Sequence, residues 1–316
     1  MLYPWQQSPW QNISQQIQQQ RLPHALILTG VSGLGKLSLA KHIAASILCD
    51  NSSEHEACGN CHSCQLFIAG SHPDHTFIEP EEPGKQIKIE QIRNLKDKQE
   101  LTPTVAKWKT VIISPAENMN INANNSLLKL LEEPQQNTLL ILCSAKPEQL
   151  PITILSRCQK VALSSPANDI AINWLQHQAS IDEQEMMMLL QLAKGAPLAA
   201  LELFDTDLIN TLQQVDDDFK SLLHGTANPV LLAKDWLQYD LMMVLNYLQT
   251  KLKKRMVLIQ NQAETSSSKE YWTIYDCIIA AIKLTSSANN INKTLLIEQF
   301  MVSVMDRNLN TIESKG

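Results

Sequence analysis

The sequence predicts an α/β domain, built on a parallel sheet with helices on both faces, followed by a region made only of helices. Short apolar runs alternate with amphipathic runs over the first half of the chain, which is typical of strands joined by helices. A glycine-rich segment follows the first apolar run directly, where such sheets bind their ligands. After the Ser-Ser-Pro at 164–166 the strand-like runs stop and helical periodicity takes over.

The strands of the first part are short apolar runs bounded by polar or turn-forming residues. We expect them at 25–28, 76–78, 110–113, 138–143 and 159–163. The runs 110–113 and 138–143 show no polar alternation, so both should be buried on their two faces. Helices are expected between the strands at 36–48, 87–101 and 124–133, with a short helix or turn at 151–156. Ile13 and Ile17, four residues apart in a Gln-rich start, favour one more helix packed on the domain.

The second part should contain three short helices and then four longer ones. They are expected at 170–178, 182–193, 197–204, 208–224, 229–260, 271–285 and 292–306, with a polar, Ser-rich loop at 261–269. Changes of pattern near 165 and 206 divide the chain into domains at 1–165, 166–205 and 206–316.

Length and charge limit the classes of function. A chain of 316 residues is long enough for two or three domains. Its net charge of −6 gives no overall basic field, so any DNA contact must be local or made through partners. We find no signal-peptide pattern and no uncharged apolar run of the roughly 18 residues that a membrane helix needs. A cytoplasmic protein without disulfides is the expectation.

The glycine-rich segment has the spacing of a phosphate-binding loop. Gly30, Gly33 and Gly35 precede Lys36, between the first strand and the first long helix. Glycines let the backbone approach a phosphate, amide groups at the helix start point at the anion, and the lysine neutralises its charge. We therefore predict that this loop can hold a phosphate group.

Two parts needed for nucleotide hydrolysis are missing. The residue after Lys36 is Leu37 instead of a Mg²⁺-binding hydroxyl, and Ser38 is turned away by about 100° on a helix. The strand 110–113 is followed by Ser114-Pro115, where such an enzyme carries an acidic pair. Glu117 lies three residues too far along and is interpreted as a solvated loop acid. Two independent defects predict that the chain does not hydrolyse nucleotide itself.

Four of the seven cysteines form a predicted metal site. Cys58, Cys61 and Cys64 follow one another at two-residue gaps, and Cys49 lies shortly before them. This spacing favours a tetrahedral, closed and therefore structural zinc site. His62 in place of Cys49, an iron–sulfur cluster and a set of buried thiols are less favoured alternatives. Few Lys or Arg residues lie nearby, so a folding role is favoured over nucleic-acid binding.

Arg157 is a candidate catalytic residue that acts on a neighbouring subunit. It follows a buried strand and a short turn, and we expect it at the carboxyl edge of the sheet. An exposed arginine there could reach the γ-phosphate bound to another subunit, as an arginine finger supplied in trans. The alternative is an ordinary surface charge or a structural ion pair.

The motifs resemble the clamp-loader subunits of bacterial DNA polymerase III, which are members of the AAA+ class. The resemblance lies in Leu127–Pro134 (LLKLLEEP), Leu150-Pro151 and Thr153–Cys158 (TILSRC). It extends from the Tyr3-Pro4-Trp5 start to a segment at 292–298, which is similar to the collar domain of that family.

Within this family the sequence is more similar to the non-hydrolysing stator subunit than to the motor. The four-cysteine insertion and the Ser-His-Pro-Asp at 71–74 are shared by both. The motor would carry a hydroxyl after Lys36, an acidic pair at 114–115 and an arginine near Leu198, and this chain has none of them.

The resemblance implies a RecA-like AAA+ domain with the zinc module at 49–64, a three-helix lid and a helical collar that assembles a hetero-pentamer. The implied partners are the motor (tau/gamma) subunits and the delta subunit and, through the complex, the sliding clamp and primed DNA; no membrane is implied. Arg157 would act in trans, ATP could bind without being hydrolysed, and nucleotidyltransferase activity would belong to the polymerase III holoenzyme. Two other classes stay open: an active motor-type AAA+ ATPase and a zinc-dependent nucleic-acid-binding adaptor.

Overall fold

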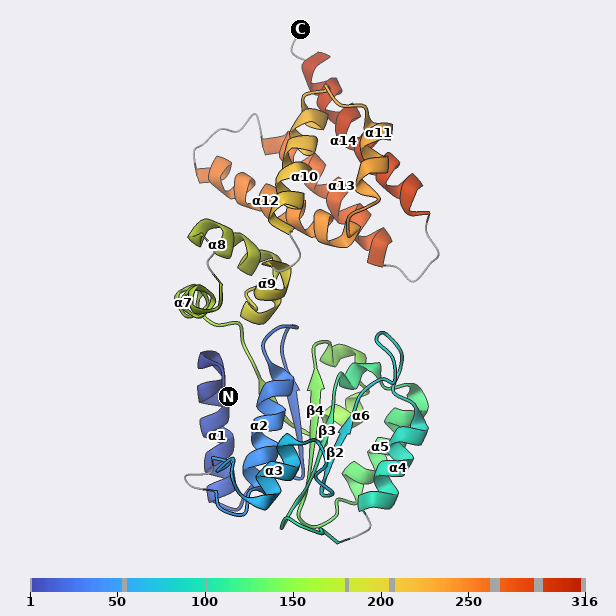
Figure 1. Cartoon of the computed structure of the whole chain (residues 1–316). Coiled ribbons are helices and arrows are strands. Elements are labelled where there is room, and N and C mark those ends of the chain that lie inside the picture. The colour runs from blue at the N-terminus through green and yellow to red at the C-terminus, as the bar shows by residue number, and fades with distance from the viewer. Residues whose placement is uncertain are drawn as a thin grey trace. The chain divides into compact units, whose positions relative to one another are not determined.

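The computed structural model describes residues 2–52, 56–99, 102–179, 182–204, 208–261, 268–286 and 292–313. The chain divides into two compact units (Figure 1). The first unit comprises residues 1–180 and 194–199, and the second comprises residues 181–193 and 200–316.

The first unit is built on a five-stranded sheet in the order β2-β3-β4-β1-β5, in which all paired strands are parallel. Its strands are β1 (Ala25–Thr29), β2 (His75–Ile78), β3 (Lys109–Ile113), β4 (Thr138–Ser144) and β5 (Gln159–Ala162). All five predicted strands are therefore present. Every residue of β3 and β4 is buried, which confirms the prediction from their unbroken apolar runs.

Helices cover both faces of this sheet. The helices of this unit are α1 (Gln7–Gln18), α2 (Lys36–Leu48), α3 (His62–Ile68), α4 (Ile89–Gln99), α5 (Ile121–Glu132), α6 (Ile152–Leu155) and α7 (Asn168–Gln178), with short 3-10 turns at Pro4–Gln6, Ala116–Asn118 and Pro147–Gln149. In Figure 1, α1 and α2 lie on one side of the sheet and α4 and α5 on the other.

The two faces of β1 belong to two different hydrophobic clusters. Leu26 and Leu28 pack with α1 and α2, in the same cluster as Ile13 and Ile43. Ala25 and Ile27 pack with α4 and α5 on the opposite face. Successive side chains of a strand point to opposite faces, so one continuous apolar run supplies both cores.

Local hydrogen bonds shift two predicted helix starts. Helix α5 begins three residues before the predicted position because the side chain of Asn120 accepts the backbone N–H of Ala123 at 2.8 Å. Helix α4 begins only at Ile89, since the backbone of Ile87 is bonded to Asn118 and Asn120. Helix α3 was not predicted, and its first turn is capped by Cys61, whose sulfur accepts the N–H of Cys64.

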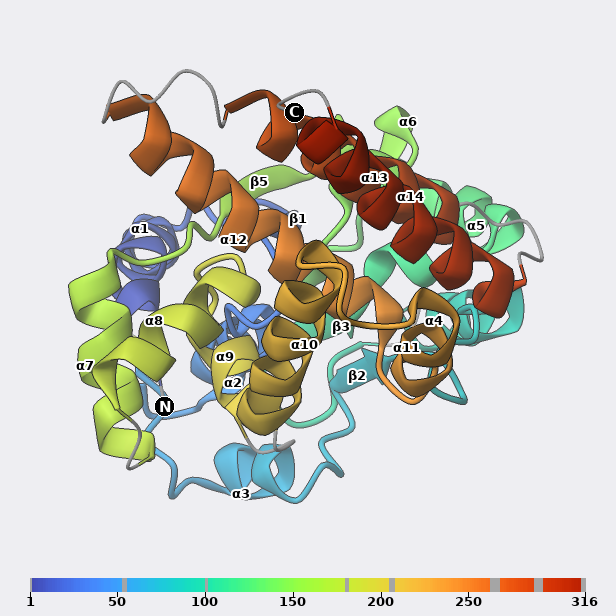
Figure 2. The same ribbon diagram turned by 90° about the horizontal axis from the view of Figure 1, so that it is seen from above.

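The described residues of the second unit form helices and no strands. They are α8 (Glu183–Leu192), α10 (Leu208–Leu223), α11 (Pro229–Trp236), α12 (Leu241–Asn261), α13 (Ser268–Ser286) and α14 (Lys293–Glu313). Helix α9 (Pro197–Phe204) contributes to both units. Helix α13 packs against α12 and α14, and α11 packs against α14 (Figure 2). The predicted loop at 261–269 lies mostly outside the described residues.

The predicted single helix at 229–260 was wrong, because the chain forms α11 and α12 with a turn between them. Trp236 at the end of α11 is fully buried, and its indole N–H donates to Asp218 at 2.9 Å. The side chain of Asp240 then accepts the backbone N–H groups of Met242 and Met243, at 3.0 and 3.3 Å. These bonds favour a new helix start over a continuous helix.

No helix in the described part of the chain is long and apolar enough to span a membrane alone. The segments Glu185–Leu192 and Pro197–Phe204 pass that test only when taken together as a bent pair.

The cap of α12 gives a stability prediction. Asp240→Ala should lower the free energy of unfolding by about 1 kcal/mol, because two backbone N–H groups of the first turn lose their acceptor. Urea unfolding followed by tryptophan fluorescence measures the loss. Asp235→Ala is the matched control, since it removes the same charge from an exposed position inside α11. Equal losses in the two variants would contradict the assignment of Asp240 as a cap.

Candidate functional site

The glycine-rich loop joins the end of β1 to the start of α2 at the carboxyl edge of the sheet. Lys36 is the first residue of α2, and its Nζ donates to the carbonyl oxygens of Gly30 at 2.7 Å and Val31 at 2.9 Å. Burial lowers the pKa of this lysine, and the neighbouring Cys143 and Glu117 oppose that shift only in part. The ammonium group is therefore bound to the carbonyls of its own loop.

The beginning of the chain covers the second half of the loop. The buried Gln6 donates from Nε2 to the carbonyls of Leu34 at 3.0 Å and Gly35 at 2.8 Å. Gly35 has a φ of +75°, and a Cβ atom there would lie 2.7 Å from Gln6 Nε2. Trp5 donates its indole N–H to Leu34 at 3.0 Å. The loop carbonyls are thus paired with side chains of the same chain.

Two further contacts hold this arrangement. Tyr3 and Trp5 stack on each other at 5.1 Å, and the ring of Trp174 in α7 meets both of them edge-on. At Gly33, with a φ of +80°, a Cβ atom would lie 2.4 Å from the Cβ of Ala199 in α9. Only glycine at position 33 lets α9 approach the loop this closely.

The carboxyl end of β3 carries no acidic pair, as the sequence indicates, but Glu117 is not the solvated loop acid that was predicted. Its Oε1 accepts the backbone N–H of Ala145 at 2.9 Å, and its Oε2 is buried without a hydrogen-bond partner. The 3-10 turn at 116–118 brings the side chain back to the end of β4. No local sequence signal indicates this, because it depends on β3 and β4 being neighbours in the sheet.

The predicted metal ligands lie together. The sulfur atoms of Cys49, Cys58, Cys61 and Cys64 all lie within 4.8 Å of one another. Cys49 and Cys61 are 3.9 Å apart, and Cys58 and Cys64 are 4.0 Å apart. Zn–S bonds of about 2.3 Å in a tetrahedron require sulfur–sulfur distances of about 3.8 Å, so the four thiols fit zinc. His62, the alternative ligand, is exposed and lies outside this cluster.

Backbone amides around the cluster favour ionised sulfur. The N–H groups of Cys58, Cys61 and Cys64 donate to the sulfurs of Cys49, Cys58 and Cys61 at 3.3 to 3.4 Å. Burial works against ionisation of Cys61, but hydrogen bonds from the backbone of Cys64 and Asp50 lower its pKa to about 6. Burial raises the pKa of Cys49, and it raises that of Cys64 to about 12, so a soft divalent ion such as zinc would displace the protons of these two thiols when it binds.

Arg157 lies at the amino edge of the sheet, so its predicted place at the carboxyl edge was wrong. It precedes β5, whose first residue, Gln159, pairs with Leu26 near the beginning of β1. The segment between β4 and β5 carries the chain back across the sheet before β5 runs parallel to β1. The predicted phosphate-binding loop and Arg157 are therefore at opposite edges of the sheet.

The guanidinium group of Arg157 is held by its own chain. Its Nη2 lies 2.8 Å from the carboxylate of Glu132 at the end of α5, and its Nη1 donates to the carbonyl of Thr153 in α6 at 3.0 Å. The side chain keeps 36% of its surface exposed. These contacts anchor the group, while part of the side chain remains exposed to solvent.

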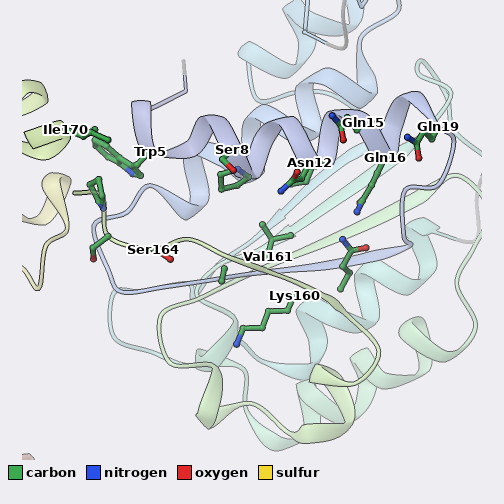
Figure 3. A pocket seen from close by; sticks show the side chains of 16 residues that line it. Trp5, Ser8, Asn12, Gln15, Gln16, Gln19, Lys160, Val161, Ser164 and Ile170 are labelled. Atoms are coloured by element: carbon green, nitrogen blue, oxygen red, sulfur yellow. The ribbon is translucent and has the colours of Figure 1, made fainter. Parts of the chain in front are cut away.

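A polar groove that the sequence did not reveal lies between α1 and the edge strand β5 (Figure 3). Its volume is about 720 Å³, and its lining includes Trp5, Gln16, Val161 and Ile170. Gln16 extends from α1 toward the strand, and its Oε1 is buried without a partner. The predicted phosphate-binding residues do not line this groove.

Comparisons with known proteins agree with the motifs. A family model described as "DNA polymerase III, delta subunit" matches residues 5–167, and one described as the AAA+ ATPase lid domain of DNA polymerase III subunit delta' matches residues 166–205. The DNA polymerase III subunit delta' of Pseudomonas aeruginosa is 34% identical over 95% of this chain and 96% of its own length.

Two further relatives match shorter stretches. The subunit delta' of Haemophilus influenzae is 37% identical and covers 64% of this chain and 61% of its own. The DNA polymerase III subunit tau of Bacillus subtilis is 29% identical and covers 59% of this chain and 34% of its own. With a family model over half of its length and a relative aligned nearly end to end, this chain belongs to the DNA polymerase III subunit delta' family.

Proposed function

We propose that this chain is the non-hydrolysing stator of the DNA polymerase III clamp loader and supplies Arg157 in trans to the ATP site of a neighbouring subunit. The observation that carries the proposal is the position of Arg157 at the sheet edge opposite the chain's own phosphate-binding loop. From there it is unable to act on a phosphate in its own loop but can meet one held by an adjacent subunit. An arginine finger of this kind raises the rate of nucleotide hydrolysis by a factor of about 10³ to 10⁵.

The chain's own loop supports the non-hydrolysing half of the proposal. Lys36 donates hydrogen bonds to two carbonyl groups in the first half of the loop, and Gln6 donates to two carbonyl groups in the second half. Leu37 offers no oxygen to Mg²⁺, and Ser114-Pro115 provides no carboxylate to hold the ion or orient water. These residues do not fit a hydrolysable Mg²⁺–nucleotide complex, so any ATP bound here would not be turned over.

The family membership supports a place in a larger assembly. We assign residues 1–165 to the AAA+ domain, 166–205 to the lid and 206–316 to the collar. The partners would be the tau/gamma motor subunits and the delta subunit in a hetero-pentamer, which places the sliding clamp on primed DNA. The lid model over residues 166–205 and the similarity to a tau subunit favour this arrangement.

We further propose that Cys49, Cys58, Cys61 and Cys64 hold one structural zinc ion. Four thiolate ligands would leave no open coordination position, so the ion would stabilise the fold and take no part in chemistry. The short sulfur–sulfur distances and the amide donors around the thiols support this proposal.

Metal analysis tests the zinc site. The purified protein should contain one zinc per chain, and Cys61→Ser should lose it because one thiolate of the tetrahedron is removed. Cys277→Ser, in α13 and outside the cluster, should retain the metal. A folded wild-type protein purified without any bound zinc would rule the site out.

Arg157→Ala in the reconstituted clamp loader tests the stator role. The ATP site that receives the arginine should lose about 10³-fold in rate, so DNA-stimulated ATP hydrolysis should fall to what the remaining sites supply. Arg21→Ala, which removes an exposed arginine after α1, is the control. Gel filtration must show an intact complex in both cases. Unchanged hydrolysis by the Arg157→Ala complex would reduce this arginine to a surface charge.

One observation favours an active ATPase as the second candidate. The buried Oε2 of Glu117 has no partner and lies near Lys36, so it is a carboxylate oxygen in the region of the phosphate-binding loop. The isolated chain should nevertheless show no ATP turnover, and Lys36→Ala should change nothing, because the hydroxyl and the acidic pair are absent. Steady hydrolysis that Lys36→Ala abolishes would replace the stator proposal with this one.

A further inference from the structure

The Ser-His-Pro-Asp motif at 71–74 has no part in the proposed function, although its polar side chains are deeply buried. His72 is 4% exposed and Asp74 is 3% exposed. The fully buried Ser63, which lies between two of the metal-site cysteines, completes the cluster. Buried polar groups are costly unless they are paired, so the partners of these three residues are informative.

The hydrogen bonds of this cluster run in one direction. The backbone N–H of Asp74 donates to His72 Nδ1 at 3.1 Å, so the ring proton must be on Nε2. His72 Nε2 lies 2.9 Å from Ser63 Oγ and donates to it. The hydroxyl of Ser63 in turn donates to the carbonyl of Leu48 at 2.5 Å.

The last of these bonds joins the two separate parts of the metal site. Leu48 directly precedes Cys49 at the end of α2, and Ser63 lies between Cys61 and Cys64. The bond between Leu48 and Ser63 therefore holds Cys49 close to the cysteines that come later in the chain.

The other end of the cluster is fixed to the chain that leads into β3. The carboxylate of Asp74 accepts the backbone N–H groups of Thr104, Val105 and Ala106 at 2.7 to 2.8 Å. Because Asp74 is anchored in this way, the backbone N–H that it offers to His72 has a fixed position.

We infer that His72 and Ser63 are positioning residues for the metal site, and the inference rests on the proposed zinc ion. Neither is a ligand. His72 orients Ser63, and Ser63 holds the end of α2 so that Cys49 is at binding distance from the other thiols before the metal arrives. Outer partners of this kind typically change metal affinity about 10- to 100-fold when they are removed.

A hydrolytic role for these residues does not fit the geometry. In a catalytic triad the histidine donates from Nδ1 to a carboxylate and accepts the serine proton at Nε2. Here Nδ1 accepts a backbone N–H, so Nε2 carries a proton and is unable to act as a base. Ser63 is also fully buried, and its hydroxyl already donates a hydrogen bond to the carbonyl oxygen of Leu48.

The test is zinc affinity, measured on the purified chain by competition with a chromophoric chelator. Ser63→Ala and His72→Ala should each weaken zinc binding about 10- to 100-fold. His72→Gln, which can place an N–H near the former Nε2, should recover part of the loss. His62→Ala is the control, because this exposed histidine lies between two ligands and outside the cluster.

The double variant Ser63→Ala/His72→Gln distinguishes positioning from general destabilisation. If both residues act through the bond to Leu48, the double variant should bind zinc no more weakly than Ser63→Ala alone. If His72→Ala does not fold, Ser63→Ala and His72→Gln still decide the question. Wild-type zinc affinity in Ser63→Ala would overturn the inference, whereas a wild-type chain without zinc would overturn the proposed metal site itself.

Discussion

The parallel pairing of β5 with β1 is the constraint on which the arrangement of this molecule depends. β1 pairs with β4 on one side and with β5 on the other, and all its residues are buried. Because both neighbours run in the same direction as β1, the loop that follows β1 is at one edge and the residue that precedes β5 is at the other. Lys36 and Arg157 are separated by this topology, whatever conformations their side chains adopt.

The glycines of the loop between β1 and α2 serve close packing in this chain. Ala199 packs against Gly33, and Gln6 and Tyr3 pack against Gly35. Each of these neighbours is so close that a Cβ atom on the glycine would clash with it. The backbone freedom that would bring a loop near a phosphate here brings it near other parts of the same protein. The expected order of strand, loop and helix was confirmed, but what the loop contacts depends on the beginning of the chain and on α9.

Features that depend on residues close together in the sequence could be predicted. All five strands were found: β1, β3 and β4 are buried along their whole length and are continuous apolar runs, and the more exposed β2 and β5 are short runs bounded by polar or turn-forming residues. Cys58, Cys61 and Cys64 were found because two-residue gaps bring sulfurs close together, and Cys49 was found because it lies shortly before them in the sequence. The edge at which Arg157 lies, the role of Glu117 and the His72–Ser63 bond were not predicted. The first two depend on which distant strands become neighbours in the sheet, and the third depends on how α3 packs against the segment before β2; one sequence reveals neither.

The common direction of the strands also explains where the cysteine cluster lies. Helix α2 starts at the carboxyl edge with Lys36 and ends with Leu48, so Cys49 and its partners lie toward the amino edge. Glu56 holds this segment to α1 and α2 through the indole N–H of Trp10 at 2.9 Å and His42 at 3.1 Å.

Arg157 lies at the same amino edge, held by the end of α5. The carboxyl edge, where parallel sheets normally bind their ligands, is packed with the chain's own side chains. The proposed action of Arg157 in trans would start from the amino edge, where a rigid framework matters more than a mobile loop. Buried hydrogen bonds such as those of Asp74 and Ser63 provide that rigidity, because breaking any one would leave a buried polar group unpaired.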